Sequence, residues 1–418
     1  MRRRSTAVIA AALVAASVVI VPGAPALAAS SDSLRAAEYW LDEYGIRAAW
    51  ATTRGAGVTI AVIDTGVDGS VVELQGAVIP GADFSGLGSP DGQTPVGPAD
   101  ESDHGTMVAS LAAGRGTGGE NGVIGSAPAA TILPLSIGFG EGSTTSDDQI
   151  AAAVRYATDA GADVINMSLT RNTLEWPTSW DDAFLYAMEH DVVVVAAAGN
   201  RGSGTTQVGA PATMPGVLTV AGVDSKGQAS FDASSQGITI GVAAPSEGLV
   251  GVTPGGGHVL WNGTSGATPI VAGIVALVRA AHPELDAANV IERVVATARD
   301  AGAQGTDPIY GFGLIDANAA VTASVPSVTE NPMGDLAEWI TVYRRAASTA
   351  VPTPTAEPAP VPEKVVAGPA NPLGTLLPTV NLLRNVGIPF GVLVLFCAAF
   401  VFVAARVVLR VRQRRRTG

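Results

Sequence analysis

The sequence predicts an α/β fold with a doubly wound, mostly parallel sheet that carries helices on both faces. From residue 58 onward, short β-branched runs alternate with amphipathic or alanine-rich stretches, the pattern of buried strands and covering helices. Apolar residues make up 47% of the chain and charged residues 15%, so there is ample material for a core. About 320 of the 418 residues remain when both ends are set aside, which favours one large domain.

The expected elements follow one another along the chain. The apolar runs predict strands at residues 58–64, 131–137, 163–168, 192–197, 217–223 and 238–243, and the other stretches predict helices at 107–113, 147–160, 180–190, 267–281 and 287–298. Glycine and proline crowd residues 81–98 and 251–257, which predicts surface loops there. The helical spacing of apolar residues between Leu336 and Tyr343 predicts a last helix.

The first 28 residues have the parts of a secretory signal peptide. Three arginines at positions 2 to 4 precede an uncharged apolar run at residues 7–21, and the small-residue site Ala-Leu-Ala follows at 26–28. The alternative is an uncleaved membrane anchor, but the apolar run is short and Pro22 breaks it. We therefore expect export of the chain.

A second apolar segment lies near the C-terminus. Residues 386–405 carry no charge and would span about 30 Å as a helix, which matches the hydrocarbon core of a bilayer. Six arginines follow within residues 406–418, so the positive-inside rule predicts a single-pass transmembrane helix in the cell membrane with a cytoplasmic tail. The alternative is a buried core helix. Seven prolines in residues 351–372 predict an extended spacer that holds the preceding domain off the membrane.

Between these ends the chain is strongly acidic. It carries 37 acidic side chains against 15 basic ones, a net charge of −22, which argues against a nucleic-acid partner and against a basic membrane-binding patch. The single cysteine, Cys397, lies within the expected membrane helix. The exported part therefore has no disulfide, no cysteine-ligated zinc and no catalytic thiol.

Amide hydrolysis by acyl transfer needs a nucleophilic hydroxyl, an imidazole and an orienting carboxylate. Asp64 ends the apolar run at 58–64 and enters a Thr-Gly turn, where a desolvated carboxylate needs a partner. His104 stands where a helix is expected to begin, before Gly-Thr. Each residue also has an ordinary alternative, namely a turn-forming aspartate and a solvated surface histidine.

Ser265 directly precedes the long helix expected at 267–281. Its hydroxyl would lie in the positive field of the helix end, and its backbone N–H would point to a developing oxyanion. We expect Pro269 to fall in the first helical turn, where its missing N–H is tolerated. The side-chain amide of Asn200, just past the strand at 192–197, is a candidate second oxyanion donor. The alternatives are a helix-capping serine and a turn-forming asparagine.

The order of these residues separates two kinds of hydrolase. An α/β-hydrolase needs serine, then an acid, then histidine, but the only histidine after Ser265 is His282, and no acidic residue lies between them. The order Asp64, His104, Ser265 is that of the subtilisins. The motifs agree, because Asp64-Thr-Gly, His104-Gly-Thr, Ala-Gly-Asn200 and Gly-Thr-Ser265-x-Ala-x-Pro resemble the four signatures of the subtilisin-like serine proteases.

This resemblance covers residues 55–320 and implies a serine endopeptidase that acts on a protein or peptide. It implies that the substrate strand lies along two segments, formed by Ser168, Leu169 and Thr170 and by Ala197, Ala198 and Gly199. Thr170 stands where a glycine often lines the specificity pocket, which predicts a narrowed pocket for small or medium side chains. Gly266 replaces a bulkier residue beside the nucleophile.

The layout of the whole chain resembles the mycosins of type VII secretion. A signal peptide is followed by a short extension at 29–57, a subtilisin-like peptidase domain at 58–322, a helical appendage at 323–350, the proline-rich linker and one membrane helix. The resemblance implies the type VII secretion machinery as a partner. The chain departs from the mycosins in one respect, since they usually carry disulfides and the exported part here has no cysteine.

No metal or other cofactor is required for this chemistry. Some subtilisins bind calcium, and acidic residues gather before His104, but their spacing fits no EF-hand loop. A structural calcium and a solvated loop are the two alternatives for this group, which comprises Asp83, Asp91, Asp100, Glu101 and Asp103.

Three functions fit these features. The first is an outward-facing membrane protease that processes an exported or cell-envelope protein, and the complete signatures favour it. The second is a structural or stabilising subunit of a secretion complex whose hydrolytic activity is dispensable. The third, a nutrient-scavenging protease, fits the membrane tether poorly because such enzymes are usually released.

Overall fold

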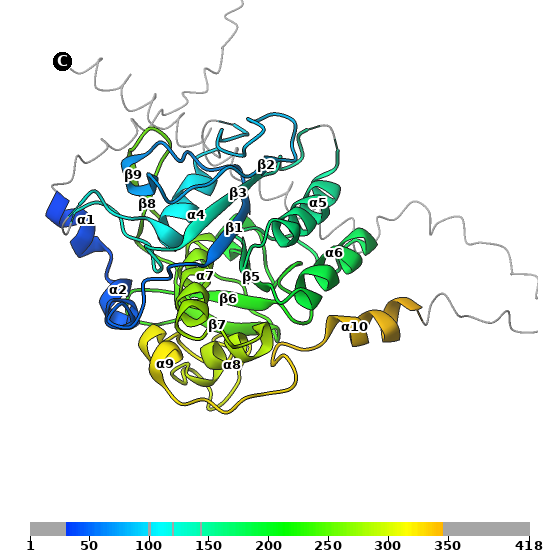
Figure 1. The fold of residues 1–418 in the computed structure, drawn as a ribbon. Helices are drawn as coiled ribbons and strands as arrows, with labels where there is room; N and C mark the ends of the chain where they lie inside the picture. The colour runs from blue at the N-terminus through cyan, green and yellow to red at the C-terminus, as the bar shows by residue number, and fades with distance from the viewer. Residues whose placement is uncertain (1–30, 99–101, 119–120, 143, 346–418) are drawn as a thin grey trace, which may run out of the picture. The chain divides into compact units, whose positions relative to one another are not determined.

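Seven strands form one parallel sheet at the centre of the computed structural model, which describes residues 31–345 apart from 99–101, 119–120 and 143 (Figure 1). The order is β2-β3-β1-β4-β5-β6-β7, and every neighbouring pair is parallel. The strands are β1 (Thr59–Asp64), β2 (Ala82–Asp83), β3 (Thr131–Ser136), β4 (Val164–Met167), β5 (Val193–Ala197), β6 (Leu218–Val223) and β7 (Ile240–Pro245). The predicted α/β fold is confirmed.

Helices cover both faces of this sheet, which explains why its strands are continuous apolar runs. On one face α4 (His104–Ala113) packs against α7 (Thr264–Ala281), and α7 also contacts α8 (Ala287–Ala296) and α9 (Ala317–Thr322). On the other face α5 (Ser146–Asp159) packs against α6 (Thr178–Glu189) (Figure 1).

The chain changes direction along the sheet at β1. β3 lies on one side of β1 and β4 on the other, so the order of the strands reverses there. In open parallel sheets, such a switch point opens a crevice at the carboxyl ends of the strands. Asp64 ends β1, Ser168 directly follows β4, and Asn200 follows β5, so all three stand at this edge.

Three short helices at the N-terminal side pack into the same core. They are α1 (Ser31–Ala37), α2 (Trp40–Glu43) and α3 (Ile46–Ala49). Trp40, Leu41 and Ile46 are fully buried, and α3 contacts α9. Residues that precede the first strand therefore supply part of the hydrophobic core.

The last described residues pack against α6. A short helix, α10 (Leu336–Trp339), continues into a π-helical turn, η3 (Ile340–Arg345), which confirms the predicted last helix. The guanidinium of Arg344 pairs with Asp181 at 2.9 Å and lies over the rings of Trp176 and Trp339. This contact anchors the end of the described region.

Two predicted loops contain regular structure. A hairpin forms from β8 (Leu249–Val252) and β9 (His258–Trp261), and β2 lies within the glycine-rich stretch 81–98. Short 3₁₀ turns add η1 (Val72–Leu74) and η2 (Arg201–Ser203). These strands are short, and whether such segments form strands depends on their pairing partners more than on their local composition.

Several predicted segments lie outside the described residues. They are the signal peptide at 1–28, the linker at 351–372, the membrane helix at 386–405 and the tail at 406–418. Within the described part, α7 alone is long and apolar enough to cross a membrane, and 83% of this helix is buried. Because it packs against the sheet, α7 is a core helix.

Candidate active site

Asp64 and His104 meet at the carboxyl end of β1. The Nδ1 atom of His104 lies 2.8 and 2.9 Å from the two carboxylate oxygens of Asp64, which is fully buried. Since a carboxylate only accepts, Nδ1 carries the proton and donates it. The backbone N–H of Thr65 donates a third hydrogen bond, at 2.7 Å, to the same carboxylate. The imidazole is thereby fixed with Nε2 as its accepting nitrogen.

Burial and the Asp64 carboxylate act in opposite directions on the pKa of His104. Burial alone would lower the pKa of this imidazole, but the charge of the Asp64 carboxylate and its hydrogen bond outweigh burial and raise the pKa above its usual range. The His104 side chain is 26% exposed, so it can meet a molecule in the crevice. The pair combines a fixed, basic imidazole with access to solvent.

Helix α4 is held close to β1 so that its first residue reaches Asp64. The hydroxyl of Thr65 accepts a hydrogen bond from the N–H of Gly105 at 2.9 Å and donates to the carbonyl of Ser102 at 3.0 Å. A Cβ atom at Gly105 would lie 2.2 Å from the carbonyl oxygen of Gly66. Only glycine allows this close approach, which explains the glycine after His104.

Ser265 is the second residue of α7, because the helix begins at Thr264 rather than at the predicted residue 267. Pro269 therefore lies inside the helix and not in its first turn, which corrects our expectation. Its missing N–H leaves the carbonyl of Ser265 without the usual helical donor. The hydroxyl of Ser168 takes that place and donates to this carbonyl at 2.8 Å.

The hydroxyl of Ser265 in turn donates to the carbonyl of Ser168 at 3.2 Å. Among the hydrogen bonds of the residues that the structure describes, none joins Ser265 to His104. The side-chain amide of Asn166 donates to the Ser168 hydroxyl at 3.0 Å and so helps to hold the two hydrogen bonds between Ser168 and Ser265. The hydroxyl thus rests against the end of β4, within the positive field at the start of α7.

Asn200 is oriented by the first residue of α7. Its amide oxygen accepts from the backbone N–H of Thr264 at 2.8 Å and from the Thr264 hydroxyl at 2.9 Å. This fixes the amide and directs its Nδ2 group away from Thr264. Gly263 has a φ of 141° and lies under the amide, and a Cβ atom there would be 2.9 Å from Nδ2. Asn200 thus keeps an N–H donor available next to Ser265.

A cavity of about 330 Å³ adjoins His104. Its walls include the predicted substrate-binding residues Ser168, Leu169 and Thr170, together with Thr65, His104, Met107 and Phe139. Phe139 is 49% exposed, which is unusual for a large apolar side chain. The cavity can therefore take an apolar side chain of a bound peptide.

The second predicted substrate segment does not line this cavity. Ala197, Ala198 and Gly199 are buried. The N–H of Ala198 binds the carbonyl of Val220, and that of Gly199 binds the hydroxyl of Thr264 at 3.1 Å. A Cβ atom at Gly199 would lie 3.1 Å from the methyl group of Thr170, so the two segments face each other.

Sequence reasoning missed several residues around the imidazole. Thr65 braces α4, and Met107 and Phe139 line the cavity. The indole of Trp261 meets the His104 ring edge to face, with centroids 5.7 Å apart. The sequence shows Trp261 four residues before Ser265, which places it near the nucleophile. Its contact with His104 depends on the β8-β9 hairpin, which the sequence did not predict.

Two of the acidic residues before His104, Asp83 and Asp91, accept hydrogen bonds from nearby hydroxyl and backbone N–H groups. Burial works against ionisation of Asp83, but hydrogen bonds from Ser85, Ser136 and Gly88 outweigh it and lower the pKa of this carboxyl. Hydrogen bonds from Ser89 and Gln93 likewise lower the pKa of Asp91. Within the described residues no three His, Cys, Asp or Glu side chains form a metal-binding group, and Asp100 and Glu101 lie outside them.

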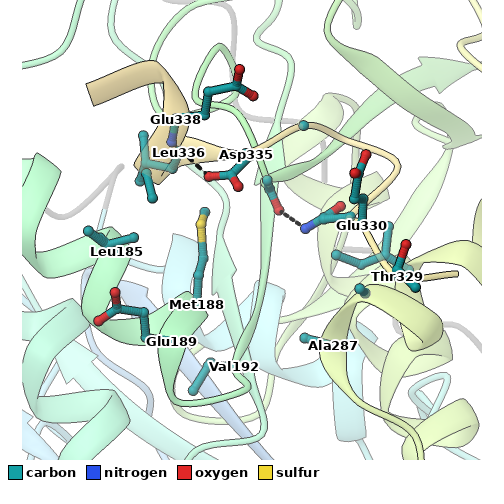
Figure 2. Close-up of a pocket in the computed structure, with 16 residues that line it drawn as sticks. Leu185, Met188, Glu189, Val192, Ala287, Thr329, Glu330, Asp335, Leu336 and Glu338 are labelled. Atoms are coloured by element: carbon teal, nitrogen blue, oxygen red, sulfur yellow. Dashed lines mark hydrogen bonds between the residues drawn. The ribbon is translucent and has the colours of Figure 1, made fainter. Parts of the chain in front are cut away.

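A second cavity, of about 490 Å³, lies between α6, α8 and the segment before α10 (Figure 2). Met188, Val192 and Leu336 supply its apolar wall, and Glu189, Glu330 and other carboxylates supply its polar one. The carboxylate of Asp335 caps α10 by accepting the N–H of Glu338. This cavity shares no lining residue with the one beside His104.

Comparison with known proteins identifies the family. The subtilase family, peptidase S8, matches residues 55–313. Fervidolysin of Fervidobacterium pennivorans is 34% identical over 322 residues, which is 69% of this chain and 44% of that protein. Mycosin-3 of Mycobacterium tuberculosis is 35% identical over 341 residues, which is 67% of this chain and 70% of that protein.

A solved structure agrees with these relatives. MycP1 from the ESX-1 type VII secretion system superimposes with a TM-score of 0.62 at 32% identity, over 71% of this chain and 88% of that one. The chain spans only part of some relatives, namely 44% of fervidolysin and 64% of the thermophilic serine proteinase of Bacillus sp. (strain AK1). The chain belongs to the subtilase family, and within it the chain is similar to the mycosins.

Proposed function

We propose that the chain is a membrane-anchored, exported serine endopeptidase that cleaves protein substrates by acyl transfer. The observation that carries this proposal is the paired hydrogen bond of Nδ1 of His104 to buried Asp64, at the sheet edge that also holds Ser265 and Asn200. Family membership supports it. The proposed chemistry needs no cofactor, and a structural calcium and a solvated loop stay the two alternatives for the acidic residues before His104.

The geometry suggests how the steps proceed. When a substrate carbonyl approaches, the Ser265 hydroxyl turns from the carbonyl of Ser168 toward Nε2 of His104, which takes its proton as the oxygen attacks the carbonyl carbon. Asp64 stabilises the imidazolium that forms. His104 then gives the proton to the leaving amine, and water repeats the sequence on the acyl-enzyme.

The developing oxyanion needs donors that are already in place. We assign this role to the side-chain amide of Asn200 and the backbone N–H of Ser265. The two bonds from Thr264 to the amide oxygen hold Asn200 in one orientation. The start of α7 adds its positive field to both donors.

The location and partners are proposed from the sequence and the relatives. An N-terminal signal at 1–28 and a membrane helix at 386–405 would keep the catalytic domain outside the membrane and residues 406–418 in the cytoplasm. A cytoplasm-dependent reporter fused after Gly418 should be active, and an inactive one would contradict this topology. The similar protein MycP1 comes from a type VII secretion system, which suggests the same association here.

The alternative is a structural subunit of a secretion complex whose hydrolytic activity is dispensable. A Ser265→Ala chain, expressed at the wild-type level in cells that lack the native copy, separates the two functions. A protease loses its cellular function with this variant. Full complementation by Ser265→Ala would favour the structural role and reject the proposal.

A further inference from the structure

His104 is restrained on two sides, and only one restraint belongs to the subtilase signatures. Asp64 holds the hydrogen-bonding edge of the imidazole. The indole of Trp261 contacts the ring itself, with centroids 5.7 Å apart and ring planes at 80°. Edge-to-face packing at this distance is attractive and restricts the tilt of both rings.

Trp261, the last residue of β9, is partly buried. It pairs with Leu249 across the hairpin, whereas its neighbours Val259 and Leu260 are 39% and 69% exposed. The indole Nε1 atom is buried and has no hydrogen-bond partner among the described residues. An unpaired buried donor is unfavourable, so the position of this ring has a reason other than its own polar group.

Two glycines provide the space for the indole. A Cβ atom at Gly251 would lie 2.9 Å from Nε1 of Trp261, and one at Gly266 would lie 3.2 Å from its Cζ2 and 2.4 Å from Leu249. Neither glycine has a left-handed φ, so their backbone conformation does not require glycine. The close approach of neighbouring side chains is what requires glycine at both positions. Gly266 also follows Ser265 directly, so the indole edge lies beside the residue after the nucleophile.

We propose that Trp261 is a positioning residue for His104, and that Gly266 is the small position that admits its indole. The inference rests on the proposed peptidase function. The indole holds the imidazole from the side that Asp64 does not touch, so that Nε2 meets the Ser265 hydroxyl when it turns. A small residue after the nucleophile and a tryptophan on β9 thus form one complementary pair.

A fluorophosphonate probe tests this without a known substrate, because its reaction with Ser265 needs the triad and the oxyanion donors but no peptide contacts. The full-length chain in detergent is compared with Trp261→Ala, Trp261→Phe and Leu260→Ala, the last as a control on the exposed side of β9. We expect the maximal inactivation rate of Trp261→Ala to fall about 10- to 100-fold. Half-saturation should change less than about threefold. Trp261→Phe should restore most of the rate, and Leu260→Ala should match the wild type.

A double-mutant cycle tests the complementary pair. Gly266→Ala alone should slow inactivation because its methyl group displaces Leu249 and the indole that pairs with it across the hairpin. It should slow Trp261→Ala by a smaller factor than it slows the wild type, since part of its effect acts through the indole. Equal rates in all variants, with only the melting temperature lowered, would overturn the inference and leave the peptidase function intact. A folded wild type that does not react would overturn both.

Discussion

Two buried carboxylates in this chain stand in opposite situations. Asp64 and Glu38 are 0% and 1% exposed, and each lies next to a basic side chain. Asp64 receives His104 on both oxygens and the N–H of Thr65. Glu38 receives the N–H of Ile124 on one oxygen. The other oxygen lies buried, 3.4 Å from Nε of Arg35, and accepts no hydrogen bond from any residue that the structure describes.

The difference shows that the hydrogen-bond and charge partners of a buried ionisable group decide whether the effect of burial on its pKa prevails. At Glu38 burial dominates and raises the pKa of the carboxyl to about 8, although the backbone bond and Arg35 oppose it. At the sheet edge, Asp64 overcomes the burial of its partner and raises the pKa of His104. Changes around Asp64 should therefore act on the rate, and changes at Glu38 should act on stability.

The largest effect should come from breaking the Asp64–His104 pair. Asp64→Asn should lower kcat by about 10³- to 10⁴-fold, because an amide does not fix the tautomer or stabilise the imidazolium. The wild-type kcat/KM should rise with pH around a midpoint above about 6.5, since the base must be neutral and Asp64 raises its pKa. In the variant this midpoint should move down.

Asp163→Asn is the matched control for this change. Its carboxylate accepts the N–H of Thr59 at the amino end of β1, away from the site, so kcat should stay near the wild-type value. An unchanged pH midpoint in Asp64→Asn would contradict the pairing. Rates are measured by hydrolysis of a peptide that the wild type cleaves.

The next effect concerns the oxyanion donor. Asn200→Ala should lower kcat by about 10²- to 10³-fold and leave KM nearly unchanged, because the donor acts in the transition state. Asn172→Ala, an exposed asparagine, should behave as the wild type. A rise in KM with constant kcat would assign Asn200 to substrate binding instead.

A smaller effect should follow at the specificity pocket. Thr170 faces Gly199, so Thr170→Gly should widen the pocket and raise kcat/KM for large side chains on the acyl side of the scissile bond by about tenfold. A peptide library with that position varied measures it. Preference of the wild type for large aromatic side chains would reject the narrowed pocket.

An effect on stability, with none on the rate, should appear at Glu38. Its folded pKa is raised, so its contribution to stability is fully present below about pH 4.5 and is lost as pH rises toward about 8. The loss can reach about 1.4 kcal/mol for each pH unit crossed. Glu38→Gln should flatten this dependence in denaturant unfolding, whereas Glu43→Gln, on the surface, should not. Identical pH dependence in Glu38→Gln and the wild type would contradict the assignment.

The sequence predicted six strands of the main sheet because a continuous apolar run that stops at a turn is a local pattern, and it did not predict β2, β8 or β9. It predicted the Asp64–His104 pair because each residue stands in a short local motif. The start of α7 was predicted three residues late. Its first N–H is satisfied by Asn200, 64 residues earlier, and no local cap marks the position.

Other features could not be found from the sequence because they depend on distant pairings. Trp261 contacts His104 because the β8–β9 hairpin, in which it pairs with Leu249, brings the indole to the imidazole. Glu38 reaches Ile124 across 86 residues, and an acidic residue in a short helical stretch ordinarily predicts a solvated surface. The sequence contains both residues, but it does not show which distant residues pack against them.

The most direct test of the proposed chemistry is fluorophosphonate labelling of the full-length wild type beside Ser265→Ala, with circular dichroism of both to establish folding. A working triad predicts stoichiometric labelling of the wild type at Ser265 and none of the variant. Equal labelling of both proteins, or no labelling of a folded wild type, would contradict the assignment of Asp64, His104 and Ser265 as the catalytic triad.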